Sequence, residues 1–512
     1  MDIVLATFNA GYIHASFGLR YLFANLGALQ RRTALVELDA AMAPLDAVEA
    51  LLARSPRIIG LGVYVWNATL TLAVVELLKA LRPDVKIVLG GPEVSHEIDA
   101  QPLCALADVV VVGEADLAFA HICTRLLAGE AVEHVVRPVL PDLATLAPPY
   151  DLYTAEDLAQ RVVYVEASRG CPFLCAFCLS ALDKGVRRFD EDTFLAALGA
   201  LHDRGLRNFK FVDRTFNLSI GSCKRILGFF LERLDPSLFV HFELIPDRLP
   251  TELKALIAAF PPGTLQFEIG IQTFDAEIAA RIDRRHDPVQ IEANLGWLRS
   301  ATGVHLHTDL IVGLPGESVA LFGAGFDRLF ALGPQEIQVG VLKRLRGAPI
   351  ARHSVPWGMI YSPRPPYEVL QTGAIPFLEM QAMKRFARFW GLLANSGHYR
   401  HTLPLLLGDT GGGGSPFERF HALSEALGAR FGRTHGIASN RLVEAVYDHA
   451  IATGVAPEVL GRALITDLMN TGRLPLPDLL RPFATEAERL IRKARPAPRD
   501  GHARQEAHGS RG

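Results

Sequence analysis

Short apolar runs alternate with helical patterns through the first two thirds of this chain, and this alternation constrains its fold more than any other feature. Apolar runs of strand length occur at residues 2–8, 34–38, 57–65, 85–90 and 108–112. Helical patterns lie between and after them, at residues 14–28, 45–53, 68–81 and 115–128. Strands separated by helices form parallel sheets. The pattern therefore predicts an α/β fold that starts with a flavodoxin-like, doubly wound sheet of five strands over residues 1–130.

The same rhythm restarts after a proline-rich segment, residues 131–160, which has no sustained periodicity and is predicted to be a linker. Six strand-like runs with helical patterns between them follow, at residues 162–168, 207–213, 239–245, 265–272, 304–313 and 336–343. They predict a partial (β/α)6 barrel of the TIM type over residues 161–345, with its chemistry at the carboxyl ends of the strands. Residues 346–495 are predicted to be a mainly helical domain, and residues 496–512 a disordered tail.

Charge and hydropathy exclude several classes of protein. The 52 Lys and Arg residues nearly balance the 55 Asp and Glu residues, so no global charge favours a nucleic-acid partner. No stretch approaches the roughly 20 uninterrupted apolar residues that cross a bilayer, and the start Met1-Asp2-Ile3 lacks the basic residues of a signal peptide. We therefore expect a folded cytoplasmic protein without a membrane span.

Three of the six cysteines, Cys171, Cys175 and Cys178, lie within eight positions directly after the strand-like run 162–168. Structural zinc needs four ligands, and no further Cys or His pair at finger spacing lies nearby. Three cysteines on one loop can instead hold three irons of a [4Fe–4S] cluster and leave the fourth iron without a protein ligand. Such an open iron can bind a substrate or cosubstrate.

The run CPFLCAFC, residues 171–178, resembles the CxxxCxΦC signature of the radical S-adenosylmethionine (SAM) superfamily. The resemblance implies that the three cysteines are metal ligands and that the open iron chelates SAM, whose reductive cleavage yields a 5′-deoxyadenosyl radical. It also implies an external electron donor such as flavodoxin or ferredoxin. Phe177 would lie beside the adenine, with simple packing in the barrel as the alternative. A radical this reactive needs a dry, enclosed site.

Further residues of the predicted barrel extend this resemblance to the SAM site. The segment FVDRTFN after the second strand departs from the glycine-rich form of the family, so that Asp213 and Thr215 both remain candidates for the methionine end. On the next two strands polar and apolar residues alternate, and this alternation directs Glu243, Glu268 and Gln272 into the barrel. Burying a carboxylate costs free energy unless it is paired or hydrogen-bonded. Ligand binding is therefore the favoured interpretation of these three residues. Gly313, in GLPGE, resembles the family's GxIxGxxE region at the adenine end, or forms a plain strand-to-helix turn.

The strand ends of the N-terminal sheet carry small or polar residues where ligands bind in open α/β sheets. They are Asn9, Gly62, Tyr64, Gly90, Gly91, Gly113 and Glu114. Tight βα turns without a ligand would explain these glycines equally well. However, a flavodoxin-like domain ahead of a radical SAM barrel resembles the cobalamin (B12)-binding radical SAM class. In particular, the chain resembles a subfamily with a C-terminal domain of unknown function (DUF4080-like). This resemblance implies that the strand ends bind cobalamin.

The DxHxxG motif that supplies an axial histidine in cobalamin mutases is absent, because Gly18 lies one residue too far from His14. We therefore expect no histidine ligand on cobalt and interpret His14 as a polar residue that opens a helix.

The resemblance implies an enzyme that methylates an unactivated carbon or a phosphinate centre of a small-molecule or natural-product substrate. A cyclisation or rearrangement without methyl transfer is the alternative within the class. A cobalamin-binding sensor with a redox-reporting cluster is the alternative outside it, although such a cluster gains nothing by lacking a fourth cysteine. The sequence assigns neither a catalytic side chain nor a substrate.

Overall fold

The computed structural model describes residues 1–183, 185–408, 414–472 and 475–490. The chain divides into two compact units, and the first contains residues 1–214, 343–352 and 361–368. The second contains residues 215–342, 353–360 and those from 369 onward. The predicted tail, residues 496–512, lies outside the described residues.

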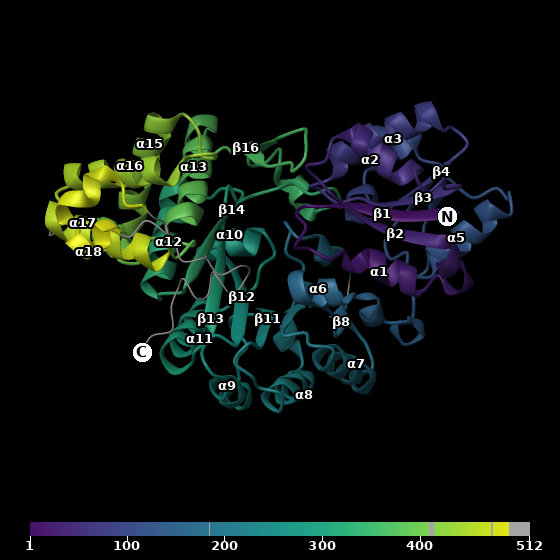
Figure 1. Ribbon diagram of the computed structural model, residues 1–512, viewed down its shortest axis with the longest axis horizontal. Helices are drawn as coiled ribbons and strands as arrows, with labels where there is room; N and C mark the ends of the chain where they lie inside the picture. The colour runs from purple at the N-terminus through teal and green to yellow at the C-terminus, as the bar shows by residue number, and fades with distance from the viewer. Residues whose placement is uncertain (184, 409–413, 473–474, 491–512) are drawn as a thin grey trace. The chain divides into compact units, whose positions relative to one another are not determined.

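The first unit begins with a six-stranded parallel sheet in the order β2-β1-β3-β4-β5-β6, of which Figure 1 labels β1 to β4. Its strands are β1 (Ile3–Asn9), β2 (Thr33–Asp39), β3 (Ile58–Gly62), β4 (Lys86–Gly90), β5 (Val109–Val111) and β6 (Val135–Val136). Its helices are α1 (Phe17–Ala24), α2 (Pro44–Leu52), α3 (Ala68–Leu81), α4 (Pro102–Leu106) and α5 (Ala118–Leu127). The order of the first five strands is that of flavodoxin, which confirms the predicted doubly wound sheet.

Both faces of this sheet are buried, because side chains of successive residues point to opposite sides. Val4, Ala6 and Phe8 of β1 pack in one core with apolar side chains of α2, α3 and α4. Ile3 and Leu5 pack in the other core with side chains of α1 and α5. Strands that are covered on both faces read as continuous apolar runs, which explains why the sequence pattern predicted them well.

The predicted linker, residues 131–160, contains more regular structure than expected, including the sixth strand, β6, and helix α6 (Ala155–Gln160). β6 has only two residues, too few to give a periodic signal. Thr154 begins α6 with a capping box: its side chain accepts a hydrogen bond from the Asp157 backbone N–H (3.1 Å), and Asp157 accepts one from the Thr154 N–H (2.9 Å).

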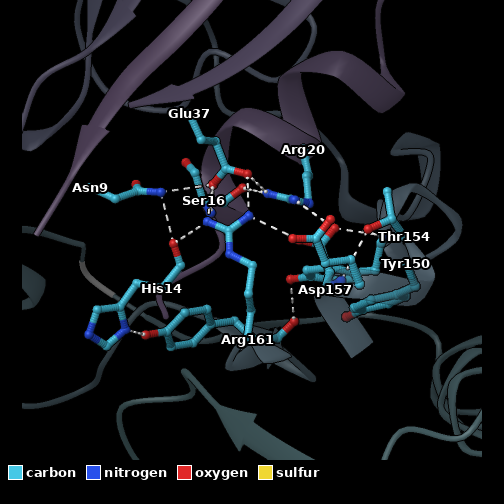
Figure 2. A network of polar contacts seen from close by, with 12 residues as sticks. Asn9, His14, Ser16, Arg20, Glu37, Tyr150, Thr154, Asp157 and Arg161 are labelled. Carbon is cyan, nitrogen blue, oxygen red and sulfur yellow. Dashed lines mark hydrogen bonds and ion pairs between the residues drawn. The ribbon is translucent and has the colours of Figure 1, made fainter. Parts of the chain in front are cut away.

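A buried network of four charged residues ties α6 to α1 and β2 (Figure 2). Arg161 Nη1 contacts Glu37 Oε2 (2.8 Å) and Asp157 Oδ1 (2.9 Å). Arg20 contacts the same two carboxylates at 2.9 and 3.0 Å. Burial alone would raise the pKa of Glu37, but Arg161 and Arg20 lower it. The charges compensate one another, so removing one of them would leave an unpaired buried charge.

A second six-stranded parallel sheet has the order β14-β13-β12-β11-β10-β7. Its strands are β7 (Val163–Val165), β10 (Asn208–Phe211), β11 (Phe239–Leu244), β12 (Leu265–Gln272), β13 (His305–Val312) and β14 (Glu336–Val341). The helices that alternate with them are α7 (Glu191–Asp203), α8 (Ile220–Leu231), α9 (Thr251–Ala258), α10 (Ala276–Arg281), α11 (Pro288–Ala301) and α12 (Val319–Ala331). The strands follow the chain order across the sheet, as in a barrel.

The C-terminal region is helical, as predicted. Its helices are α13 (Phe377–Leu393), α14 (Leu403–Leu407), α15 (Pro416–Phe431), α16 (Ser439–Ala452), α17 (Pro457–Asn470) and α18 (Glu486–Leu490). An aromatic cluster joins the first of them to α12: Trp390 lies 4.7 Å from Phe326 and 4.8 Å from Phe420, and Phe386 lies 5.0 Å from Phe417, between ring centroids. Among the described residues, no helix is both long enough and apolar enough to cross a membrane.

Replacing Phe386 with Ala is expected to lower the melting temperature, because deleting a buried aromatic ring costs roughly 3–5 kcal/mol. Leu378 lies on the same helix but is 77% exposed, so Leu378→Ala should change stability by no more than about 0.5 kcal/mol. Differential scanning calorimetry of the full chain compares the two variants. Equal shifts would contradict the packing described here.

Candidate cofactor-binding site

The three clustered cysteines lie on a loop that is closed at its base by two short antiparallel strands, β8 (Ser168–Arg169) and β9 (Arg187–Arg188). We call the described residues of this loop, 170–183 and 185–186, the cysteine loop. At its neck Gly170 has φ +91°, and a Cβ there would overlap the carbonyl oxygen of Gly185. Only glycine permits this close approach of the two backbones.

The cysteine loop brings its three thiols near one another in a partly buried setting. Cys171 and Cys175 are buried and Cys178 is half-buried. Burial raises the pKa of the Cys171 thiol, and the neighbouring Cys178 and Cys175 add to this effect. No three His, Cys, Asp or Glu side chains in the described ranges could together hold a single metal ion. An iron–sulfur cluster makes a different demand, since each thiolate binds its own iron, and three thiols on one loop fit that demand.

Asp213 anchors the entry to the cysteine loop. Its carboxylate accepts hydrogen bonds from Ala167 N (2.9 Å) and Ser168 Oγ (2.5 Å), and burial raises its pKa to about 6. These hydrogen bonds fix the start of the loop, and the predicted contact of Asp213 with SAM stays a prediction. Thr215, the other candidate, and Phe177 are half-buried, and their predicted contacts with SAM stay predictions.

Arg169, at the neck of the loop, is surrounded by three carboxylates. It contacts Glu114 (2.8 Å), Asp116 through two nitrogens (3.0 and 3.1 Å) and Glu166 (2.9 Å). Arg187, opposite Arg169 in the β8–β9 ladder, also pairs with Glu114. Burial raises the pKa of Glu166 to about 7 even though Arg169 acts to lower it. We call these five residues the Arg169 cluster.

A cavity of about 260 Å³ opens at the carboxyl ends of β3, β4 and β5. Strand-end residues line it on the sheet side, namely Gly62, Tyr64, Gly90, Gly91 and Gly113. Aromatic and charged side chains line the rest, including Phe17, Tyr21, Phe119, Asp116, Glu166 and Arg169. We call it the sheet-edge cavity. It exceeds the roughly 150 Å³ that admits a benzene ring in an engineered protein core, so it has room for the flat, largely apolar tail of cobalamin.

Five of the seven residues predicted to bind cobalamin thus meet in one cavity, and two have other partners. Asn9 donates hydrogen bonds to His14 O (2.8 Å) and Glu37 Oε1 (2.9 Å), and Glu114 belongs to the Arg169 cluster. The pattern of strand-end glycines could not reveal Tyr21 or Glu166, because neither follows a strand of the N-terminal sheet.

His14 lies in the turn between β1 and α1 and is exposed. Its Nδ1 is hydrogen-bonded to the hydroxyl of Tyr164 (2.7 Å). The helix predicted over residues 14–28 begins only at Phe17, because the preceding turn is held by other contacts, such as the hydrogen bond from Arg161 to His14 O (2.7 Å).

In the second unit, one face of strands β11–β14 carries a row of ionisable side chains. Glu243, Glu268, His307 and Glu336 are neighbours in the strand register. His241 Nε2 lies 3.1 Å from Glu268 Oε2. The sequence pattern identified the two glutamates on β11 and β12 but missed the residues on β13 and β14, which belong to no motif of the radical SAM superfamily quoted above.

The row continues with an ion-pair chain on β13 and β14. His305 lies 2.9 Å from Glu336, and His307 lies 3.4 Å from Glu336 and 3.3 Å from Asp309. Burial alone would lower the pKa of His307, but Asp309 and Glu336 raise it to about 10. Burial would raise the pKa of Glu336, but the two histidines hold it well below its usual value. The two carboxylates therefore favour the protonated form of His307.

Gln272 ends β12 in a strained conformation, with φ +70° at an irregularity in the strand register after Gly270. Its side chain is buried, and its Oε1 has no hydrogen-bond partner among the described residues. Strained residues with unsatisfied buried atoms concentrate at ligand sites. Of the three polar residues predicted on β11 and β12, Gln272 therefore fits a bound ligand best.

Gly313 has φ +91°, and a Cβ there would overlap Val369. Close packing alone therefore explains this glycine, and its predicted place at the adenine stays a prediction. The neighbouring Glu317 is buried; it accepts a hydrogen bond from Thr273 (2.7 Å), and burial raises its pKa to about 8.

Comparison with known proteins identifies three families along the chain. Residues 3–123 match the B12 binding domain and residues 165–322 match the radical SAM superfamily. Residues 356–493 match a protein family of unknown function, DUF4080. The chain thus has a B12 binding domain followed by a radical SAM domain, which is the domain arrangement of the cobalamin-dependent radical SAM family. These two domains imply a [4Fe–4S] cluster, SAM and cobalamin as cofactors.

Two curated relatives are methyltransferases. The 2-(S-pantetheinyl)-carbapenam-3-carboxylate methyltransferase of Streptantibioticus cattleyicolor is 26% identical over 353 residues, which make up 60% of this chain and 50% of that protein. The cobalamin-dependent radical SAM methyltransferase TokK of Streptomyces tokunonensis is 25% identical over 342 residues, 58% of this chain and 48% of TokK. The chain thus spans about half the length of these relatives.

The radical SAM methyltransferase TsrM from Kitasatospora setae, solved with cobalamin and a [4Fe–4S] cluster bound, shares the fold. It aligns with a TM-score of 0.57 at 16% identity and covers 88% of this chain and 99% of its own.

Replacing Cys171, Cys175 or Cys178 with Ala should remove the iron–sulfur cluster, because no other described loop brings three thiols together. Iron and sulfide content after anaerobic reconstitution measures the loss. Cys104→Ala, Cys123→Ala and Cys223→Ala are the matched controls and should keep the full iron content. Loss of the cluster in any control variant would show that the ligand assignment is wrong.

Hydroxocobalamin should bind the first unit with its dimethylbenzimidazole tail displaced, which gives an absorption spectrum of the base-off type. Ala115→Trp, which fills the sheet-edge cavity, should weaken binding by roughly tenfold or more, equivalent to about 1.4 kcal/mol. His14→Ala should leave the spectrum unchanged. A folded protein that does not bind hydroxocobalamin, or a base-on spectrum, would contradict this assignment.

Proposed function

We propose that this radical SAM enzyme is a methyltransferase that acts on an unactivated carbon, or a phosphinate centre, of a small-molecule or natural-product substrate. One observation carries the proposal: Arg169 both lines the sheet-edge cavity and stands at the neck of the cysteine loop. A cavity suited to cobalamin and a loop suited to the cluster are therefore neighbours within the first unit. The two methyltransferase relatives support the same class of reaction.

When bound, the cluster and SAM supply a radical that removes a hydrogen atom from the substrate, and cobalamin supplies the methyl group. The chain's own residues hold these groups and exclude water. Cys171, Cys175 and Cys178 bind three irons and leave the fourth open to SAM. We assign Gln272 as an acceptor for a SAM hydroxyl or ammonium group, because a buried acceptor without a partner costs about 1–3 kcal/mol. Glu243 and Glu268 complete the polar face around it.

The enzyme also requires an electron donor, for which a flavodoxin or a ferredoxin is our proposal. We place the reaction in the cytoplasm, where reducing conditions keep cysteine thiols from forming disulfides. The near balance of charge gives no reason to expect a nucleic-acid substrate.

Reduction of the cluster-loaded protein with dithionite or a flavodoxin system should release 5′-deoxyadenosine from SAM, slowly, even without substrate. Cys175→Ala should abolish this release. Gln272→Leu keeps the approximate volume but removes the acceptor, so SAM binding should weaken by roughly three- to tenfold. Leu378→Ala, on an exposed surface, should behave as the wild type. If no cluster-replete preparation releases 5′-deoxyadenosine, the cobalamin-binding sensor would be favoured over the enzyme.

The products separate methyl transfer from the alternatives. Methyl transfer forms S-adenosylhomocysteine alongside 5′-deoxyadenosine, whereas cyclisation or rearrangement forms 5′-deoxyadenosine alone. Mass spectrometry of turnovers with candidate substrates distinguishes these outcomes.

A further inference from the structure

We propose that Arg169 is a positioning residue that couples the cysteine loop to the occupancy of the sheet-edge cavity. A ligand that fills the cavity would hold the neck of the loop closed and thereby protect the cluster. The inference rests on the cofactors of the family and does not depend on methyl transfer.

The Arg169 cluster joins three separate pieces of the chain. Arg169 belongs to β8, two residues before the first cysteine, and Glu166 directly follows β7. Glu114 and Asp116 belong to the loop that follows β5 of the N-terminal sheet. Glu114 bridges Arg169 and Arg187, which are paired across the neck of the cysteine loop. The Glu114 carboxylate, in the loop after β5, thus pairs with both strands at the base of the cysteine loop.

These contacts are directional and sheltered from water. The side chains of Arg169, Glu166 and Asp116 are 14%, 8% and 7% exposed. Asp116 binds the guanidinium through both of its oxygens, the geometry that fixes orientation most strongly. The guanidinium also lies 4.6 Å from the ring centroid of Tyr21. A shift of the loop after β5 would therefore move Arg169 with it.

The same side chains line the sheet-edge cavity. Asp116, Glu166, Tyr21 and Arg169 all contribute to its wall. A ligand in the cavity therefore touches the loop after β5 and the neck of the cysteine loop at once. Ligands shift a conformational equilibrium only through contacts that differ between its states. Here those contacts include the atoms that close the neck, so binding should favour the closed neck.

The test measures how fast the cluster loses iron to a chelator, with and without hydroxocobalamin. Cluster-loaded full-length protein is exposed anaerobically to excess EDTA, without SAM or substrate, and desalted at intervals. Elemental mass spectrometry then gives iron and cobalt per chain. For the wild type, hydroxocobalamin should slow iron loss roughly fivefold, which corresponds to about 1 kcal/mol. Arg169→Gln is measured at a hydroxocobalamin concentration that loads one cobalt per chain, and its iron loss should be equally fast with and without hydroxocobalamin.

Removal of Arg169 leaves Asp116 and Glu166 without their cation, so the double variant Asp116→Asn with Arg169→Gln is made as well. Whichever of these two variants retains both the iron–sulfur cluster and bound cobalt is the one compared with the wild type. Arg161→Gln is the matched control, because Arg161 is equally buried between two carboxylates (Figure 2) but lies outside the cavity lining and the cysteine loop. It should retain the slowing by hydroxocobalamin.

Two results would overturn the inference alone: bound cobalt that does not slow iron loss in the wild type, or full slowing in the Arg169 variants. A wild type that binds no cobalt would overturn this inference together with the proposed function. Cobalt content therefore separates the two failures.

Discussion

The parallel direction of the strands is the constraint on which the rest of this structure depends. Within each sheet the carboxyl ends lie along one edge, and each connection must cross back through a helix before the next strand begins. Loops that share an edge can therefore build one site from distant parts of the sequence. In the first unit this brings Gly62, Gly90 and Gly113 to one cavity. Ion pairs of Glu114 and Asp116 with Arg169 then hold the loop after β5 against the neck of the cysteine loop, which follows β7 of the other sheet.

This arrangement buries charged side chains, and the chain pairs them with side chains of opposite charge. Arg20 and Arg161 share Glu37 and Asp157, while Arg169 is held by three carboxylates. Buried ion pairs contribute little net stability compared with apolar side chains of similar size, but they are expensive to break. These clusters therefore fix the geometry of the loops more than they stabilise the fold. Gln272 is uncharged and differs from these pairs, because its buried oxygen has no partner among the described residues.

Much of the fold could be predicted from the sequence, because fully buried strands and amphipathic helices have clear periods. The helix at 68–81 and the strand at 265–272 were predicted to the residue. β6 was missed, since two residues carry no period. The spacing of the three cysteines predicted a loop that binds an iron–sulfur cluster. The glycines at the strand ends predicted most of the residues that line the sheet side of the sheet-edge cavity. Arg169, Glu166 and the histidines of β13 were not predicted, because their roles arise from tertiary pairing that no local pattern records.

The neck of the cysteine loop has a consequence for how a cluster could be assembled. The backbone of Gly170 approaches Gly185 closely, and the β8–β9 ladder and Glu114 hold the two ends of the loop together through protein contacts. Ordering a chain segment costs roughly 1–2 kcal/mol per residue in backbone entropy. Here part of that cost is met when the protein folds, so the thiols start out on a short, closed segment. Incoming iron and sulfide therefore meet a loop whose ends are already fixed.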